Sequence, residues 1–206
     1  MIIFGASGDL TKRKLMPALY TLYKDARLPD GFSILGIGRT EYTDEYYRQY
    51  ILGELQNFVP AKDRKEEELE AFCSHLHYLT LDPAEAEGYP LLDRRLQELT
   101  GEEKPDNLLF YLATPPSLHG VIPLHLKAAR LNRPHARIIV EKPFGYDLES
   151  AQKLNKIYAS VFEEHQIYRI DHFSEIMRRY TCRHTYRNSF RSVYEKVWKT
   201  AWKNSR

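Results

Sequence analysis

Short apolar runs alternate with longer amphipathic stretches along most of this chain. The apolar runs predict buried strands, and they are MIIF, FSILGIGR, LHYLTLD, NLLFYLAT, ARIIVEKPFG and QIYRID. Apolar residues between the runs recur at helical spacing, as Leu15, Leu19 and Leu22 do, and further helices are expected within 42–56, 62–75, 88–100, 118–131 and 147–164. Alternating strands and helices predict an α/β fold with a doubly wound, mostly parallel sheet and helices on both faces.

A glycine-rich turn, GASGDL, follows the first predicted strand at once and leads into a helix. Gly5 and Gly8 would let backbone N–H groups approach a ligand, and the N-terminus of the next helix favours a diphosphate. Ser7 and Lys12 could add phosphate contacts. The spacing departs from G-x-G-x-x-G, so on spacing alone a tight turn that binds nothing is an equally good interpretation.

The second predicted strand ends at Arg39, with Thr40 beside it. Sites that prefer NAD usually hold the ribose 2′-hydroxyl with an acidic residue here, about 20 residues after the glycines. An arginine instead suits the 2′-phosphate of NADP by bidentate pairing. An exposed surface arginine is the simpler interpretation of Arg39 alone, but together with the glycine turn it favours NADP.

Three more strand ends carry candidate residues, because ligands of such sheets bind at the carboxyl ends of the strands. Asp82 follows the third strand, where an adenine or ribose would lie, although Asp-Pro is equally typical of a helix start. Pro115 and Pro116 follow the fourth strand as a rigid wall, suited to a nicotinamide pocket or to a stiff loop. Lys142 follows the fifth strand, where it could bridge a cofactor and an oxygen-rich substrate or lie in a solvated loop.

The formal net charge of +2 hides an abrupt change in composition near residue 173. Residues 1–173 carry 21 Lys and Arg against 26 Asp and Glu, whereas residues 174–206 carry 9 against 2. The second segment contains both tryptophans, and its aromatic residues recur every four positions, a spacing typical of a basic, aromatic helix. We therefore expect a dinucleotide-binding domain over 1–173 and a divergent tail over 174–206.

The rest of the composition excludes several classes of protein. Cys73 and Cys182 have no metal-ligand spacing, so no metal site is expected, and such cysteine usage indicates a reducing compartment. No apolar run reaches the length of a membrane span, and the N-terminus lacks the pattern of a signal peptide. The sequence predicts a cytoplasmic protein that binds no nucleic acid.

Five stretches together resemble the glucose-6-phosphate dehydrogenase family: GASGDLTKRKLMPALY, GIGRT, FYLATPPSLHG, IIVEKPFGYDL and QIYRIDHF. The resemblance covers residues 1–173 and implies a Rossmann-like fold and the NADP-dependent oxidation of glucose 6-phosphate to its lactone, in the pentose phosphate pathway. Residues that it places at the cofactor are Gly5, Ala6, Ser7, Gly8, Asp9, Leu10, Lys12, Arg39, Asp82, Tyr111 and Lys142. It also implies that Lys142 and His172 bind the substrate and that Asp171 orients a catalytic histidine.

That catalytic histidine has no counterpart in this sequence, which contains no motif like QNHLLQ. The family continues after RIDH as YLGKE, where this chain has Phe173 and SEIMRR, and the second domain, with its oligomer interface, is missing. None of the other histidines is expected to replace the base. The favoured interpretation is a truncated or frameshifted, inactive cofactor-binding half of the enzyme. The alternatives are a non-catalytic NADP-binding regulator and an interaction module whose tail binds an anionic surface. The simpler interpretation of the tail is that it docks on this chain's own sheet edge.

Overall fold

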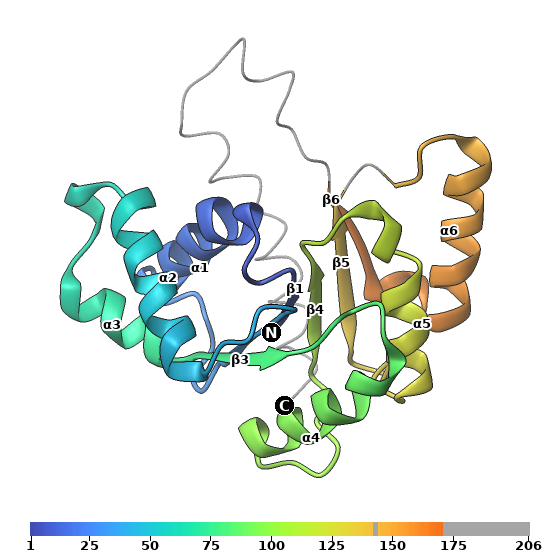
Figure 1. Ribbon diagram of the computed structural model, residues 1–206, viewed down its shortest axis with the longest axis horizontal. Coiled ribbons are helices and arrows are strands. Elements are labelled where there is room, and N and C mark those ends of the chain that lie inside the picture. Colours follow the sequence, from blue (N-terminus) through green and yellow to red (C-terminus); the bar gives the residue numbers. More distant parts are fainter. Residues whose placement is uncertain (142–143, 171–206) are drawn as a thin grey trace.

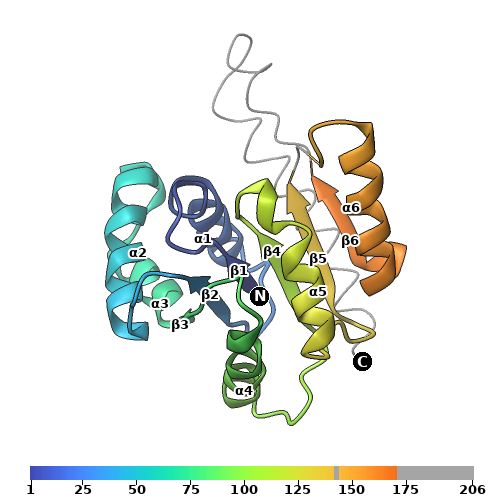
Figure 2. The same ribbon diagram turned by 45° about the vertical axis from the view of Figure 1, so that its right-hand side comes forward.

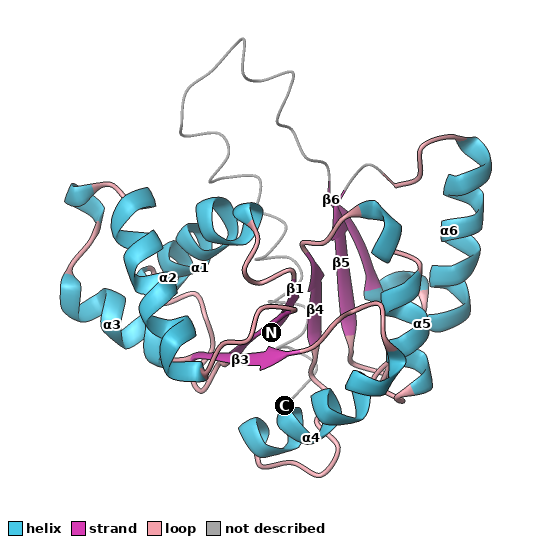
Figure 3. Cartoon of the chain, viewed as in Figure 1, coloured by secondary structure: helices cyan, strands magenta, loops and turns pink. Residues whose placement is uncertain are grey.

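The computed structural model describes residues 1–141 and 144–170. Its centre is a six-stranded parallel sheet in the order β3-β2-β1-β4-β5-β6 (Figures 1 and 3). The strands are β1 (Ile2–Phe4), β2 (Ile34–Gly38), β3 (Leu76–Thr80), β4 (Leu109–Leu112), β5 (Arg137–Glu141) and β6 (Ile167–Ile170). This is the doubly wound order in which the chain starts at the middle of the sheet and builds outward twice, so the predicted Rossmann-like fold is confirmed.

Six α-helices connect these strands and cover both faces of the sheet, as Figure 2 shows. They are α1 (Met16–Lys24), α2 (Asp44–Phe58), α3 (Glu66–Ser74), α4 (Tyr89–Thr100), α5 (Val121–Ala128) and α6 (Leu148–Val161). Helices α1 to α3 share one buried cluster, and α4 to α6 share the other. Because successive strand residues point to opposite faces, Ile3 belongs to the first cluster and its neighbours Ile2 and Phe4 to the second.

Local sequence explains where several helices begin and end. The Thr43 side chain accepts a hydrogen bond from the Tyr46 N–H at 3.1 Å and so caps α2. Asp147 and Ser150 form a reciprocal capping box at the start of α6. Gly101 ends α4 with a φ of +70°, which a residue without Cβ adopts at little cost.

The prediction of one helix over 118–131 is too long at both ends. A short 3-10 turn, Pro116–Leu118, comes first, and α5 itself covers only Val121–Ala128. Pro115, which precedes another proline, is extended and so delays the helix, and Arg130 ends the element with a φ of +57°.

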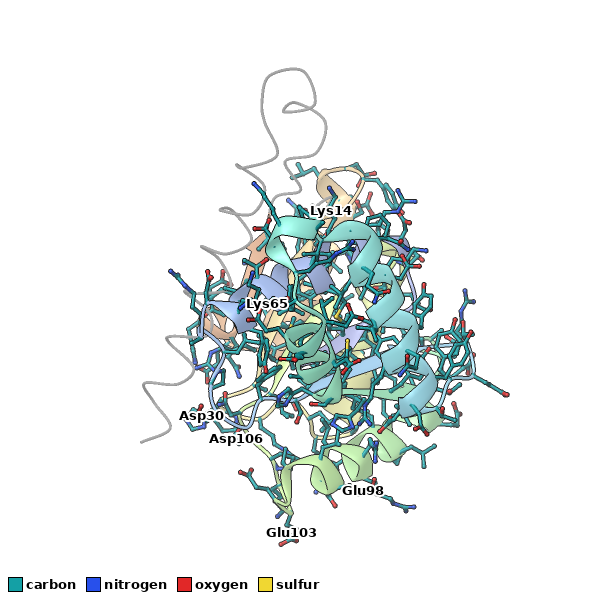
Figure 4. The ribbon with its side chains drawn as sticks, turned by 90° about the vertical axis from the view of Figure 1, so that its left-hand side faces the viewer. Lys14, Asp30, Lys65, Glu98, Glu103 and Asp106 are labelled. Atoms are coloured by element: carbon teal, nitrogen blue, oxygen red, sulfur yellow. The ribbon has the colours of Figure 1, made fainter. Side chains whose placement is uncertain are left out.

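The outer surface of the helices is polar, as the amphipathic pattern requires. Figure 4 labels three exposed charged residues: Lys65 just before α3, Glu98 on α4 and Glu103 in the loop after α4. Within residues 1–141 and 144–170, no helix combines the length and apolar character needed to cross a membrane. The same residues hold no cluster of three His, Cys, Asp or Glu side chains able to bind a metal ion.

Candidate functional site

The candidate residues gather at the carboxyl ends of the strands, around the point where the strand order reverses between β1 and β4. The glycine turn follows β1, and Arg39 follows β2 directly. These two strands are neighbours, with Phe4 paired to Ile37, so their ends lie side by side. On the other side of the turn, β4 delivers the 113–116 loop, since Phe4 is also paired to Leu112. Doubly wound sheets bind dinucleotides at this point of reversal in the strand order.

Gly5 is required by both its conformation and its surroundings. Its φ is +87°, and a Cβ on it would lie 2.2 Å from the Ala113 carbonyl oxygen. The amides of Gly5 and Ala6 both donate to the Ile37 carbonyl, at 3.0 and 2.9 Å. Gly8 closes the turn by donating its N–H to the Gly5 carbonyl at 3.0 Å. These hydrogen bonds hold the turn against the carboxyl end of β2.

Two buried hydroxyl groups hold the carbonyl groups of this turn. Thr11 donates to the Gly5 carbonyl at 2.9 Å, and Tyr47 of α2 donates to the Ala6 carbonyl at 3.2 Å. Both side chains are fully buried. Sequence reasoning identified neither contact. Thr11 lies only three residues after Gly8, which gave a weak signal for the first contact, and nothing local pointed to Tyr47.

The helix after the turn supplies free backbone donors. It begins at Asp9 and runs through a π-helical segment, Thr11–Leu15, into α1. Met16 donates its N–H to the Thr11 carbonyl, and Pro17 has no N–H with which to continue the α-helical pattern. The first-turn amides of any helix lack partners within it and attract anions.

Two charged residues near the turn, Asp9 and Lys12, form ion pairs of different length. Asp9 is exposed and pairs with Arg13 at 2.6 Å. Lys12, a predicted phosphate contact, lies 3.8 Å from Glu54, a long distance for an ion pair. Because the attraction falls with distance, this contact is weak enough for Lys12 to turn to an anionic ligand.

Arg39 is exposed at the end of β2. Its guanidinium has no ion pair or hydrogen bond with any residue of 1–141 or 144–170. Next to it, Thr40 accepts a hydrogen bond from the Thr80 hydroxyl at 3.4 Å, which links the ends of β2 and β3. An unpaired arginine beside a phosphate-binding turn can take an anionic group without first breaking an ion pair.

Tyrosine rings pack between α2 and the ends of β2 and β3. Tyr42, three residues after Arg39, lies 5.2 Å from Tyr78 and 4.7 Å from Tyr46 between ring centroids. Tyr47 lies 4.8 Å from Tyr78. Burial raises the pKa of Tyr78 to about 12, so its hydroxyl stays protonated at neutral pH. Sequence reasoning did not identify this cluster, although YTDEYYRQY was a visible signal.

Asp82 forms a turn, and the alternative prediction that it caps a helix is wrong. Its carboxylate accepts the Ala84 N–H at 3.0 Å, two residues on. The helix α4 begins only at Tyr89, with Gly88 in the capping position. The Asp-Pro pair therefore favoured a local turn, which such side chains make as readily as a helix start.

Tyr111 lies inside β4 and is buried among core residues. Its hydroxyl donates to Glu141 at the end of β5. The side chain thus joins the ends of two strands at the candidate site.

His119 fixes the loop after β4. Its Nε2 lies 3.0 Å from the Thr114 carbonyl, which can only accept, so Nε2 carries the proton. Burial lowers the pKa of His119, which favours the neutral ring at pH 7. The proline loop is therefore held in one shape by a neutral histidine.

Lys142, Asp171 and His172, together with the tail 174–206, lie outside the described residues. Their predicted roles stay predictions. The described strands end next to them in sequence, at Glu141 and Ile170, and these two residues are paired neighbours of β5 and β6.

The comparison with protein families gives one match over most of the chain. Residues 2–175 match the family model described as "Glucose-6-phosphate dehydrogenase, NAD binding domain". This range starts in β1 and includes all six strands.

Individual relatives and solved structures agree with that match. The glucose-6-phosphate 1-dehydrogenases of Aggregatibacter actinomycetemcomitans and Treponema pallidum are 50% and 39% identical over 177 residues, which cover 84% of this chain. The chain spans about a third of the length of these relatives, 35% and 34% respectively.

Two solved structures share the fold. One is titled "Glucose-6-phosphate dehydrogenase in complex with its substrate glucose-6-phosphate"; it is 36% identical with a TM-score of 0.73, over 83% of this chain and 36% of its own. The enzyme from Mycobacterium avium is 32% identical with a TM-score of 0.72, over 84% of this chain and 35% of its own. With its glycine turn, its strand order and its family match in agreement, this chain belongs to the glucose-6-phosphate dehydrogenase family, of which it carries the NAD binding domain.

Proposed function

We propose that this chain binds NADP at the carboxyl edge of its sheet, as the cofactor-binding part of a glucose-6-phosphate dehydrogenase. The observation that carries the proposal is the unpaired Arg39 beside the Gly5–Leu10 turn, on adjacent parallel strands. The turn and the first helical amides take the diphosphate, and Arg39 takes the 2′-phosphate.

Asp82 and Tyr111 are proposed to act at opposite ends of this site. Asp82 follows β3, beside the strand that carries Arg39, and so lies on the adenosine side. Tyr111 is buried, so its contribution to cofactor binding is to hold the end of β5 through Glu141.

Preference for NADP over NAD follows from the charge of Arg39. A hydrogen bond between charged groups contributes about 1.5–3 kcal/mol, which corresponds to roughly tenfold or more in affinity. Arg39→Asp should abolish the preference, because a carboxylate repels the 2′-phosphate and can accept a hydrogen bond from the 2′-hydroxyl of NAD.

The test is calorimetric titration of the 206-residue chain with NADP and with NAD. Arg94→Asp is the matched control, since Arg94 is exposed on α4 and the substitution makes the same change in net charge. The control should keep the preference for NADP. Equal affinities of the unmodified chain for the two dinucleotides would contradict the proposal.

Hydride transfer from glucose 6-phosphate is proposed for the family's full-length enzyme and not for this chain alone. The sequence contains no counterpart of the histidine motif that supplies the base, and loss of a general base costs about 10²–10⁴-fold in rate. Lys142 and His172 would bind the substrate and Asp171 would orient the base. Binding of NADP without turnover also fits a non-catalytic NADP-responsive module.

The cytoplasm is the proposed location. Cys73 is free and buried, as expected of a protein that needs no disulfide.

A further inference from the structure

We infer that Tyr47 is a positioning residue for the cofactor diphosphate, because its buried hydroxyl fixes the peptide that presents the Ser7 N–H. The inference rests on the proposed function and adds to it a residue from another element. Tyr47 lies on α2, 41 positions along the chain from the carbonyl to which it donates.

One planar peptide unit joins the Ala6 carbonyl to the Ser7 N–H. In a trans peptide these two groups point in opposite directions, so whatever holds the carbonyl also sets the direction of the N–H. Tyr47 holds the carbonyl at 3.2 Å. The Ser7 N–H donates to no group within the part of the chain that the structure describes, so it remains free for a ligand.

The preceding peptide of the turn is held differently. Its N–H, on Ala6, donates to the Ile37 carbonyl, and its carbonyl, on Gly5, accepts from both the Gly8 N–H and the Thr11 hydroxyl. Three bonds therefore fix this peptide. Within residues 1–141 and 144–170, the Ala6–Ser7 peptide makes a single hydrogen bond, and it comes from Tyr47. The position of the free donor thus depends on a single side chain.

Packing makes the position of the Tyr47 hydroxyl specific. The ring is fully buried, and a Cβ on Gly36 would lie 3.0 Å from its Cζ and hydroxyl and 2.8 Å from the Ala6 Cβ. Only a glycine in the middle of β2 lets the ring pass beneath the turn. The hydrogen bond to the Ala6 carbonyl therefore depends both on the hydroxyl of Tyr47 and on a glycine at position 36.

The orientation matters because a diphosphate attracts N–H groups and repels carbonyl oxygens. Without the hydroxyl donor, the Ala6 carbonyl would be buried without a partner, and the peptide would gain by rotating toward solvent in the site. Rotation would turn the oxygen toward the ligand and the Ser7 N–H away from it. Tyr47→Phe removes only the hydroxyl and leaves the ring to fill its space.

The experiment compares NADP with adenosine 2′-monophosphate, which has the adenosine and the 2′-phosphate but no diphosphate. Tyr47→Phe should weaken NADP binding about three- to tenfold, the range expected for one lost hydrogen bond, and leave the monophosphate within about twofold. A residue that only stabilised the fold would not separate the two ligands. Circular dichroism of each variant checks that it is folded.

A control variant outside the turn isolates the contact. Tyr158→Phe removes a hydroxyl that is buried on the opposite face of the sheet, without a hydrogen-bond partner in residues 1–141 and 144–170. It should leave both affinities unchanged.

A measurement on the unmodified chain keeps the inference testable even if Tyr47→Phe does not fold. In a nitrogen–proton correlation spectrum, the Ser7 amide proton should shift strongly downfield as NADP saturates the protein and should stay in place with the monophosphate. NADP binding without that shift, or equal NADP affinity of Tyr47→Phe and the unmodified chain, would overturn the inference and leave the proposed function intact. No NADP binding by the unmodified chain would overturn both.

Discussion

Asp44 joins three elements of the fold, and replacing it with asparagine tests how much that connection stabilises the protein. One carboxylate oxygen accepts the Tyr78 N–H at 2.8 Å. The other accepts Arg95 Nη2 at 2.6 Å and His77 Nδ1 at 3.0 Å. These partners lie on β3 and α4, whereas Asp44 is the first residue of α2. β3 is the edge strand, so the carboxylate also covers an N–H that would otherwise be open to pairing with another chain.

Asp44→Asn should destabilise the protein by about 2 kcal/mol at pH 7. An asparagine oxygen can still accept from Tyr78, but its NH2 group then faces the donors of Arg95 and His77. Hydrogen bonds to a charged group contribute about 1.5–3 kcal/mol each, and the 27% exposure of the Asp44 side chain reduces the sum through solvent screening. With a typical urea dependence of about 2 kcal/mol per molar, the unfolding midpoint should fall by about 1 M.

The pH dependence follows from the same contacts. Burial raises the pKa of Asp44, but the hydrogen bonds from Tyr78 and His77 and the charge of Arg95 outweigh it, so the pKa lies below the ordinary value of 3.8. A depressed carboxyl pKa stabilises the folded state above the unfolded pKa, and this contribution is lost as the pH falls through the folded pKa. The difference in free energy of unfolding between the unmodified chain and Asp44→Asn should therefore disappear as the pH falls below 3.8.

The assay is urea unfolding followed by circular dichroism at pH 7 and in acid. Glu164→Gln is the control, because Glu164 pairs with Arg169 at 2.7 Å but is 78% exposed, and no measurable change is expected. A difference below about 0.5 kcal/mol for Asp44→Asn at pH 7 would refute the reasoning, since surface substitutions alone reach that size. A difference that persists unchanged in acid would refute the assignment to the carboxylate charge.

Three further predictions concern the turn, the buried cysteine and catalysis. Gly5→Ala should lower stability by more than about 2 kcal/mol in urea unfolding and abolish NADP binding, because its Cβ would overlap the Ala113 carbonyl at a φ of +87°; normal binding would show that the turn relaxes freely. Burial raises the pKa of Cys73 to about 12, so iodoacetamide at pH 8 should label this thiol in urea but not in the folded chain, as peptide mass spectrometry would show. Rapid labelling without urea would mean that α3 opens readily. The purified chain should form no measurable NADPH from glucose 6-phosphate, and robust absorbance at 340 nm would show that another group replaces the missing base.

The sequence by itself determined the elements of the fold and the edge of the sheet at which the candidate residues lie. The apolar runs are strands because each is short and bounded by turn residues, and these are local properties. The GASGDL turn and Arg39 each follow a strand, so their place at the carboxyl edge required only the alternation of strands and helices. The two wrong predictions, the length of α5 and the helix cap at Asp82, concerned only where a helix begins or ends.

The tertiary structure alone decided which side chains from distant parts of the chain meet one another. Tyr47 reaches the Ala6 carbonyl only because β1 and β2 are neighbours and Gly36 leaves room beneath the turn. Asp44 meets Arg95 from 51 positions away, through the way α2 and α4 pack at the edge of the sheet. Such contacts depend on strand order and side-chain packing, which are properties of the assembled sheet. A sequence pattern records the chemistry of each residue and its immediate neighbours, and it holds no information about which distant group that residue will meet.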